Sequence, residues 1–143
     1  MKKKVMFTIP SLVEGGTEKV LVDLINYIDA NKYIKILVLF EKKGVNLSAV
    51  SDAVEIYDLK KKNRYSFFKL VFKLAKLFNN IKQDTVLSFM SYSNLISILA
   101  KLLSRFRLNF IISVHSYLSS KLLYVRFRRM KKFLYKSFFK YSI

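Results

Sequence analysis

The chain has 143 residues, of which 52% are hydrophobic, and a formal net charge of +18. This length suits one ordinary domain with its own core, and we do not expect a second domain within it. It contains no cysteine and a single histidine, which excludes disulfides, thiolate metal sites and a zinc or iron site built by this chain alone. The lack of cysteine suits a reducing cytosol.

The charge is unevenly distributed along the chain. All nine acidic residues lie at or before Asp84, so every charged residue after it is Lys or Arg. The partner of such a cationic surface could be anionic lipid, nucleic acid, an acidic protein or a phosphorylated substrate. Lys101 and Arg105 break the best apolar stretch, so we expect no segment that spans a membrane.

The amino terminus resembles a signal peptide only in outline, because Pro10 interrupts its short apolar run and no cleavage site follows. We interpret Val5 to Ile9 as a buried strand that leads through Gly15 and Gly16 into a helix. Paired glycines let a ligand approach closely, and the first N–H groups of the helix point outward at the positive end of its dipole. This pattern suits a phosphate, although a plain tight turn between strand and helix has the same sequence features.

The remaining elements alternate between strand and helix. The first helix is followed by a strand over 33–40, a short ambiguous segment over 46–53, a strand over 54–59, a helix beginning at Ser66, a strand over 84–90, a helix over 94–104 and a strand over 109–114. Near-continuous apolar runs are typical of strands covered on both faces. The order predicts an α/β fold with a Rossmann-like, doubly wound parallel sheet and right-handed crossovers.

Two of the predicted helices are basic and amphipathic. In the helix that Ser66 is expected to cap, one stripe is apolar and one is basic: Phe68, Phe72, Ala75 and Phe78, against Lys69, Lys73 and Lys76. A second helix is predicted from Lys121, with aromatic and basic stripes that extend to Tyr141. Such a pattern fits either a helix at a membrane surface or one packed on the sheet with its charges in water.

His115 is the one side chain that would naturally titrate near neutral pH. It follows the strand over 109–114, at the sheet edge where Gly15 and Gly16 are expected, and this edge is where open α/β sheets hold ligands. A lone histidine can also be purely structural. The chain lacks the GxSxG, HExxH and CxxC motifs, and it lacks the paired acids of a receiver domain, so hydrolase, metalloenzyme and receiver functions are not expected.

Four segments together resemble a known family: KKVMFTIPSLVEGGTEKVLVDLINYI, YIKILVLFEKKG, DTVLSFMSYSNLISILA and LNFIISVHSYLS. In order and spacing they resemble the amino-terminal, acceptor-side domain of bacterial GT-B retaining glycosyltransferases of the family 4 type. By this resemblance, residues 1–143 correspond to the N-terminal half of a GT-B fold.

The resemblance implies transfer of a sugar, with retention, from a nucleotide-diphosphate donor to a glycan or lipid-linked acceptor, without a required metal or other cofactor. It also implies that the loop Gly15, Gly16, Thr17 and Glu18 approaches the donor diphosphate. His115 would hydrogen-bond the sugar or acceptor as the catalytic-site residue, and Asn94 and Ser116 would line the cleft. The implied location is cytoplasmic or peripheral, at the inner face of the plasma membrane.

Two departures from the family pattern matter. Val114 stands where many relatives carry Glu, and the acidic Glu-x7-Glu motif of the carboxyl-terminal domain has no counterpart after Asp84. We therefore expect a fragment or one half of a split enzyme, inactive without a partner chain. The alternative is a basic membrane-surface or adaptor module without catalysis, and nonspecific nucleic-acid binding ranks last because it rests on charge alone.

Overall fold

The computed structural model describes residues 1–13, 15–63, 66–105 and 107–114. The chain divides into two compact units, Met1–Ser113 and Val114–Ile143, and only Val114 of the second is among the described residues. The helix predicted from Lys121 to Tyr141 therefore lies outside the described part. The elements of the first unit are β1 (Lys3–Ile9), α1 (Gly16–Tyr27), β2 (Tyr33–Leu39), the 3-10 helix η1 (Val45–Ala49), β3 (Val54–Asp58), α2 (Phe67–Ile81), β4 (Thr85–Phe89), α3 (Ser91–Leu103) and β5 (Asn109–Ser113).

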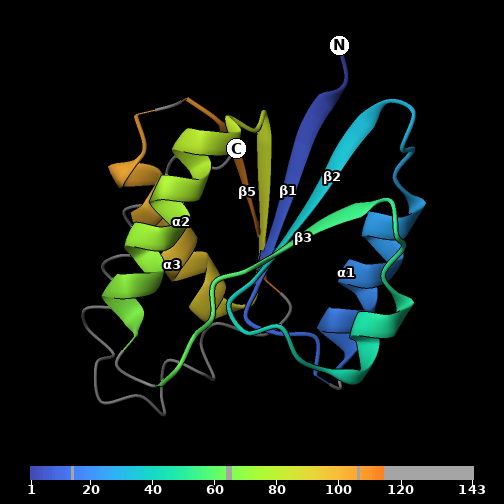
Figure 1. Ribbon diagram of the computed structural model, residues 1–143, viewed down its shortest axis with the longest axis horizontal. Helices are drawn as coiled ribbons and strands as arrows, with labels where there is room; N and C mark the ends of the chain where they lie inside the picture. Colours follow the sequence, from blue (N-terminus) through green and yellow to red (C-terminus); the bar gives the residue numbers. More distant parts are fainter. Residues whose placement is uncertain (14, 64–65, 106, 115–143) are drawn as a thin grey trace. The chain divides into compact units, whose positions relative to one another are not determined.

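The five strands form one parallel sheet in the order β3-β2-β1-β4-β5. The chain builds outward from β1 to β3, then returns to the other side of β1 to add β4 and β5. Helix α1 covers one face of the sheet, whereas α2 and α3 cover the other (Figure 1). The predicted α/β, Rossmann-like, doubly wound fold is thus confirmed.

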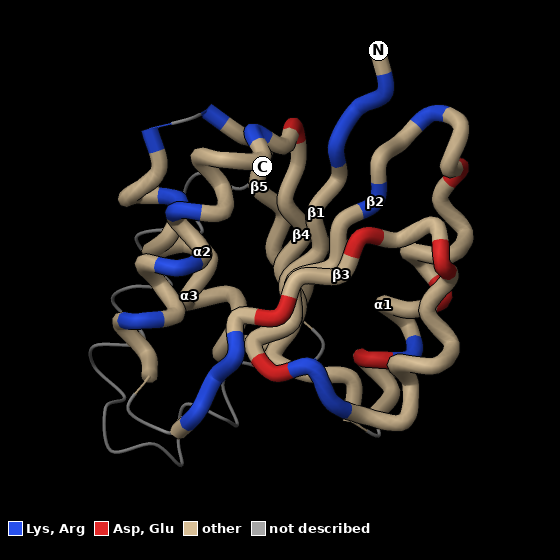
Figure 2. Tube along the Cα trace, in the orientation of Figure 1, with Lys and Arg blue, Asp and Glu red and all other residues tan. Residues whose placement is uncertain are grey.

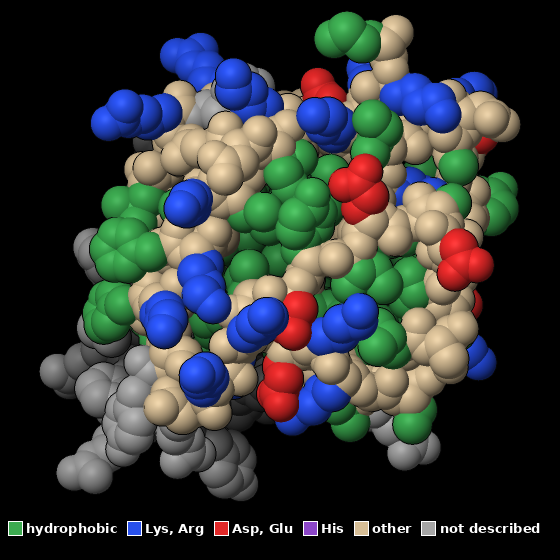
Figure 3. Space-filling view, in the orientation of Figure 1, with side chains coloured by type: hydrophobic (Ala, Val, Ile, Leu, Met, Phe, Trp, Pro, Cys, Tyr) green, Lys and Arg blue, Asp and Glu red, His purple; other side chains and the backbone are tan. Residues whose placement is uncertain are grey.

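The acidic residues gather in one part of the fold, whereas basic residues occur throughout it. Acidic residues are concentrated around α1, β2 and β3, whereas lysines run along α2 (Figure 2). The space-filling view shows basic side chains gathered over α2 and over the segment that follows β3 (Figure 3). The stretch from Lys60 to Gln83 contains no Asp or Glu, so the lysines of this face have no acidic residue beside them in the chain.

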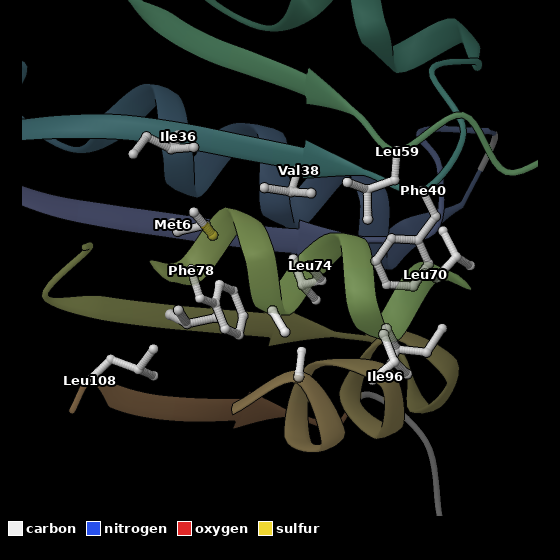
Figure 4. Close-up of a cluster of buried hydrophobic side chains, with 14 residues drawn as sticks. Met6, Ile36, Val38, Phe40, Leu59, Leu70, Leu74, Phe78, Ile96 and Leu108 are labelled. Atoms are coloured by element: carbon white, nitrogen blue, oxygen red, sulfur yellow. The ribbon is translucent and has the colours of Figure 1, made fainter. Parts of the chain in front are cut away.

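Each face of the sheet has its own hydrophobic core. Alternate residues of a strand point to opposite faces, so Met6 packs under α2 and α3 while Phe7 packs under α1. The α2 side is filled by Ile36, Val38, Leu74 and Phe78, among others (Figure 4). Burial on both faces explains why the central strands are apolar along most of their length.

The structure corrects the predicted orientation of α2. Phe68 and Phe72 were expected on the apolar face, but their side chains are 71% and 63% exposed. Ala75 and Phe78 are buried as predicted, and Leu70, Val71 and Leu74 complete the buried face. A helix this rich in apolar residues offers more than one apolar stripe, and contact with α3 and the sheet selects the one that is buried. No described helix is long and apolar enough to cross a bilayer.

The start of α2 also differs from the expected cap. Ser66 occupies the N-cap position but makes no side-chain bond to the helix, because its hydroxyl donates to Asn63 Oδ1 at 2.9 Å. Lys73, predicted in a solvated stripe, is only half-exposed and donates from Nζ to the carbonyl of Leu59. The segment after β3 is therefore tied to α2 by side chains from both.

Candidate functional site

The carboxyl ends of the strands meet at one edge of the sheet, which we call the carboxyl edge. The strand order reverses between β1 and β4, so the loops that follow these two strands diverge at this edge. Such a switch point is where doubly wound sheets open a crevice for ligands. The glycine turn follows β1 and the first turn of α3 follows β4, so both border this position.

A contact within the structure accounts for the glycine at position 15 but not for the one at position 16. Gly15 is extended, with φ of 174°, so its backbone does not require glycine. A Cβ at this position would instead lie 2.4 Å from Glu18 Oε2, because the carboxylate folds back against the turn. Gly16, the first residue of α1, is exposed, and a Cβ there would meet no atom of the described residues within 4 Å. Among the described residues, therefore, nothing fills the space beside Gly16 at the start of α1.

Glu18 lies in the first turn of α1, as predicted, and is 7% exposed. A negative charge here is stabilised by the positive end of the helix dipole. Thr17, beside it, is half-buried. The proximity of Gly15, Gly16, Thr17 and Glu18 is thus observed, while their contact with a donor diphosphate remains a prediction.

The loop after β1 is braced by the loop after β2, a feature that the sequence analysis missed. Gly44 has φ of +123°, and a Cβ there would lie 1.9 Å from the backbone carbonyl of Leu12. The Leu12 N–H donates to Lys43 O at 2.9 Å, and the Asn46 N–H donates to Leu12 O at 3.2 Å. This contact fixes the path of the chain just before the glycine turn. The sequence feature that could have indicated this contact is Gly44, the last residue of the EKKG segment.

A second missed feature is a cluster of four buried hydroxyl groups between β1, β4 and α3. The Thr8 and Ser97 hydroxyls are 2.9 Å apart, and Ser93 donates to Thr8 Oγ1 at 3.1 Å. Ser88 donates to Ser93 at 3.2 Å and to Ser97 at 3.4 Å. All four side chains are fully buried, so the bonds hold α3 in register with the strands on either side of the switch point.

Asn94 joins the start of α3 to the end of β5. Its Nδ2 donates to Ser113 O at 3.2 Å, and its side chain is 1% exposed. Its Oδ1 is buried without a hydrogen-bond partner among the described residues. Val114 is 40% exposed and is the last described residue, so the predicted site residues His115 and Ser116 lie outside the described part. Their proximity to the glycine turn stays a prediction.

An aromatic cluster supports the same edge. The Tyr92 ring, in the first turn of α3, packs edge-on against Phe40 with centroids 5.9 Å apart and against Phe67 at 6.3 Å. Burial raises the pKa of the Tyr92 hydroxyl above its usual value of 10.0. Within the described ranges, no group of three or more His, Cys, Asp or Glu residues could hold a metal ion.

Comparisons with known proteins agree with this architecture. No protein-family model matches the chain, and no functionally curated protein matches it either. Among solved structures, the chain is similar to a glycosyltransferase from Rickettsia africae ESF-5, with a TM-score of 0.61 and 16% identity. The match covers 89% of this chain and 34% of that one, so this chain spans about a third of the length of the enzyme. The likeness shows a glycosyltransferase-like α/β fold, which is the coarser part of the resemblance read from the sequence.

Proposed function

We propose that this chain is the acceptor-side half of a retaining glycosyltransferase of the GT-B type. The single observation that carries the proposal is the open start of α1 at the switch point of a glycosyltransferase-like sheet. There, a Cβ on Gly16 would touch no atom of the described residues, so the described part of the fold does not explain the glycine. Space for a ligand beside the first N–H groups of the helix does explain it.

In the proposed reaction, the bond between the sugar C1 and the donor diphosphate breaks, and a bond from C1 to an acceptor oxygen forms on the same face. The acceptor proton leaves with the diphosphate. N–H groups at the start of α1, aided by the helix dipole, would stabilise the charge that develops on the diphosphate. His115, which follows β5 in the sequence, would hydrogen-bond the sugar or the acceptor.

A GT-B enzyme closes its site between two domains, and the similar Rickettsia chain is about three times as long as the matched region. We propose that a second α/β domain, supplied in cis or in trans, provides most contacts to the nucleotide. The 143-residue chain by itself should then bind a nucleoside diphosphate weakly and transfer no sugar.

Titration of the isotope-labelled chain with UDP and GDP, followed by NMR, tests this proposal. The amide resonances of residues 15–18 should shift, and Gly16→Val should weaken binding about tenfold by filling the open space. Val20→Ala, at an exposed position of the same helix, is the matched control. Unchanged binding by Gly16→Val would refute the phosphate role of the turn. Robust sugar transfer by the chain without any partner would refute the half-enzyme proposal.

One observation favours a second candidate, a membrane-surface module. Phe68 and Phe72 lie one helical turn apart on α2 and are both largely exposed, and Lys69 and Lys76 on the same helix are exposed as well. Exposed aromatic residues flanked by lysines suit the interface of an anionic bilayer. The two candidates are compatible if the acceptor is held in a membrane.

A further inference from the structure

A separate cationic cavity lies at the carboxyl edge, between the segment after β3 and the first turns of α2. Its volume is about 270 Å³, and buried Leu59 and Leu70 contribute to its lining along with Asn63 and Ser66. The remaining lining residues are all lysines: Lys60, Lys61, Lys62, Lys69 and Lys73. We call this feature the lysine cavity.

The charges of the lysine cavity are not neutralised by neighbouring carboxylates. None of its ammonium groups forms an ion pair with an acidic residue of the described ranges; the ion pair at this edge joins Lys43 to Glu41 at 2.9 Å. The Asp58 carboxylate accepts backbone N–H bonds instead, from Lys60 at 2.8 Å and Lys42 at 3.3 Å. Like charges held together repel one another, and a bound anion would relieve that repulsion.

Two of the lysines are already held in place. Lys73 Nζ donates to the Leu59 carbonyl, which leaves further N–H groups of the ammonium available. Lys61 Nζ lies 4.8 Å from the centroid of the Tyr92 ring, a favourable cation–π distance. Because these side chains lose less conformational freedom when an anion arrives, the cavity is partly preorganised.

The chemistry of the lining selects the kind of anion. Drug-sized ligands need cavities above about 300 Å³, so the volume of about 270 Å³ suits a small group rather than a whole nucleotide. Among the described residues, the lining side chains other than lysine are Leu59, Asn63, Ser66 and Leu70. Several point-charge donors match the oxygens and multiple charge of a phosphate or diphosphate better than a single carboxylate.

We propose that the lysine cavity is a binding site for a phosphate or diphosphate group, presented either by a soluble phosphate ester or by a lipid headgroup. The site is distinct from the glycine turn after β1, since the lysine cavity is built by the segment after β3 and by α2. It extends the proposed function, because an acceptor that carries a phosphate could be held there. Its test needs neither a nucleotide nor sugar transfer, so it can fail while the proposed function stands.

The experiment is a calorimetric titration of the full chain with inorganic diphosphate and with inorganic phosphate. Diphosphate should bind more tightly than phosphate, and the double variant Lys62→Gln/Lys69→Gln should weaken diphosphate binding at least about tenfold. Both lysines are exposed, so the fold should tolerate the change. Lys76→Gln/Lys82→Gln removes the same charge from exposed positions outside the cavity and should weaken binding less than about threefold.

Vesicles of phosphatidylcholine, with and without phosphatidylglycerol, identify the source of the phosphate. Binding to anionic vesicles that is lost in the cavity variant but kept in the control variant supports a lipid headgroup. If the cavity variant weakens diphosphate binding but does not change vesicle binding, the result supports a soluble phosphate ester. Equal losses in the two double variants would mean that overall charge, not this cavity, attracts the anion, and would overturn the proposal. So would the absence of both diphosphate and anionic-vesicle binding.

Discussion

The two edges of the sheet differ in how many of their charged side chains bond to the rest of the fold. At the amino edge, where the strands begin, Asp84 accepts from the Lys4 N–H at 2.7 Å and Lys4 Nζ donates to Ile81 O at 3.0 Å. The Asn109 N–H donates to Asp84 O at 2.9 Å, so one short segment joins β1, β4 and β5. At the carboxyl edge, by contrast, the side chains of Lys60, Lys62 and Lys69 make no hydrogen bond or ion pair with another described residue.

Positive charge by itself does not distinguish these edges. The amino edge also has a cationic cavity, larger at about 620 Å³ and lined by Lys101, Arg105 and Arg107. That cavity includes the carboxylate-bearing Asp84, however, and Lys101 Nζ lies 5.4 Å from the centroid of Phe110. We therefore expect anion binding at the lysine cavity, whose described lining includes no acidic residue, rather than at the cavity of the amino edge.

The largest effect is expected at the brace behind the glycine turn. Gly44→Ala should lower the free energy of unfolding by about 3 kcal/mol, because φ of +123° strains an L-residue and its Cβ would overlap the Leu12 backbone. Gly16→Ala should cost nothing and could stabilise α1 by up to about 1 kcal/mol. Urea denaturation of both variants measures the difference. Similar stabilities would show that the brace does not fix the loop.

A smaller effect is expected at the amino edge. Asp84→Ala removes the acceptor of the Lys4 N–H and should lower the free energy of unfolding by about 1 kcal/mol. Diphosphate binding at the carboxyl edge should be unchanged, since the two edges share no side chains. Denaturation and calorimetry on the same variant test both statements. Loss of diphosphate binding in a folded Asp84→Ala protein would contradict the assignment of separate roles to the two edges.

The smallest effect concerns alkaline pH. Burial raises the pKa of Tyr92 above its usual value of 10.0, so the unfolded chain loses this proton first as the pH rises. The contribution of the protonated Tyr92 hydroxyl to the stability of the fold is fully present below pH 10.0. It is lost as the pH rises through the higher pKa that Tyr92 has in the folded state. Tyr92→Phe should therefore lose less stability above this pH than the parent chain. Tyr27→Phe is the control, because Tyr27 is 90% exposed; an equal response of both variants would argue against a role of burial.

Local pattern was enough to predict the secondary structure in order. The apolar runs that became β1, β2 and β4 and the turn at Gly15 and Gly16 are visible without any neighbour in space, because burial on both faces demands apolar residues throughout. The doubly wound arrangement followed from the alternation of strands and helices. The position of Glu18 in the first turn of α1 was likewise a local matter.

Contacts between distant segments were not predictable in this way. The sequence suggested Phe68 and Phe72 as core residues, yet packing against α3 and the sheet buries Leu70 and Leu74 instead. The hydroxyl cluster joins Thr8 to Ser97, which are 89 positions apart, and no periodic pattern in the sequence predicts it. Such polar groups become partners only after the sheet has formed.

The sequence by itself therefore determined the order of strands and helices, the glycine turn and the imbalance of charge, because each depends on residues close together in the chain. Only the tertiary structure decided which stripe of α2 is buried, that Gly44 supports the loop after β1 and that five lysines surround one cavity. These features depend on where separate segments meet, and the meeting is set by packing across the whole sheet.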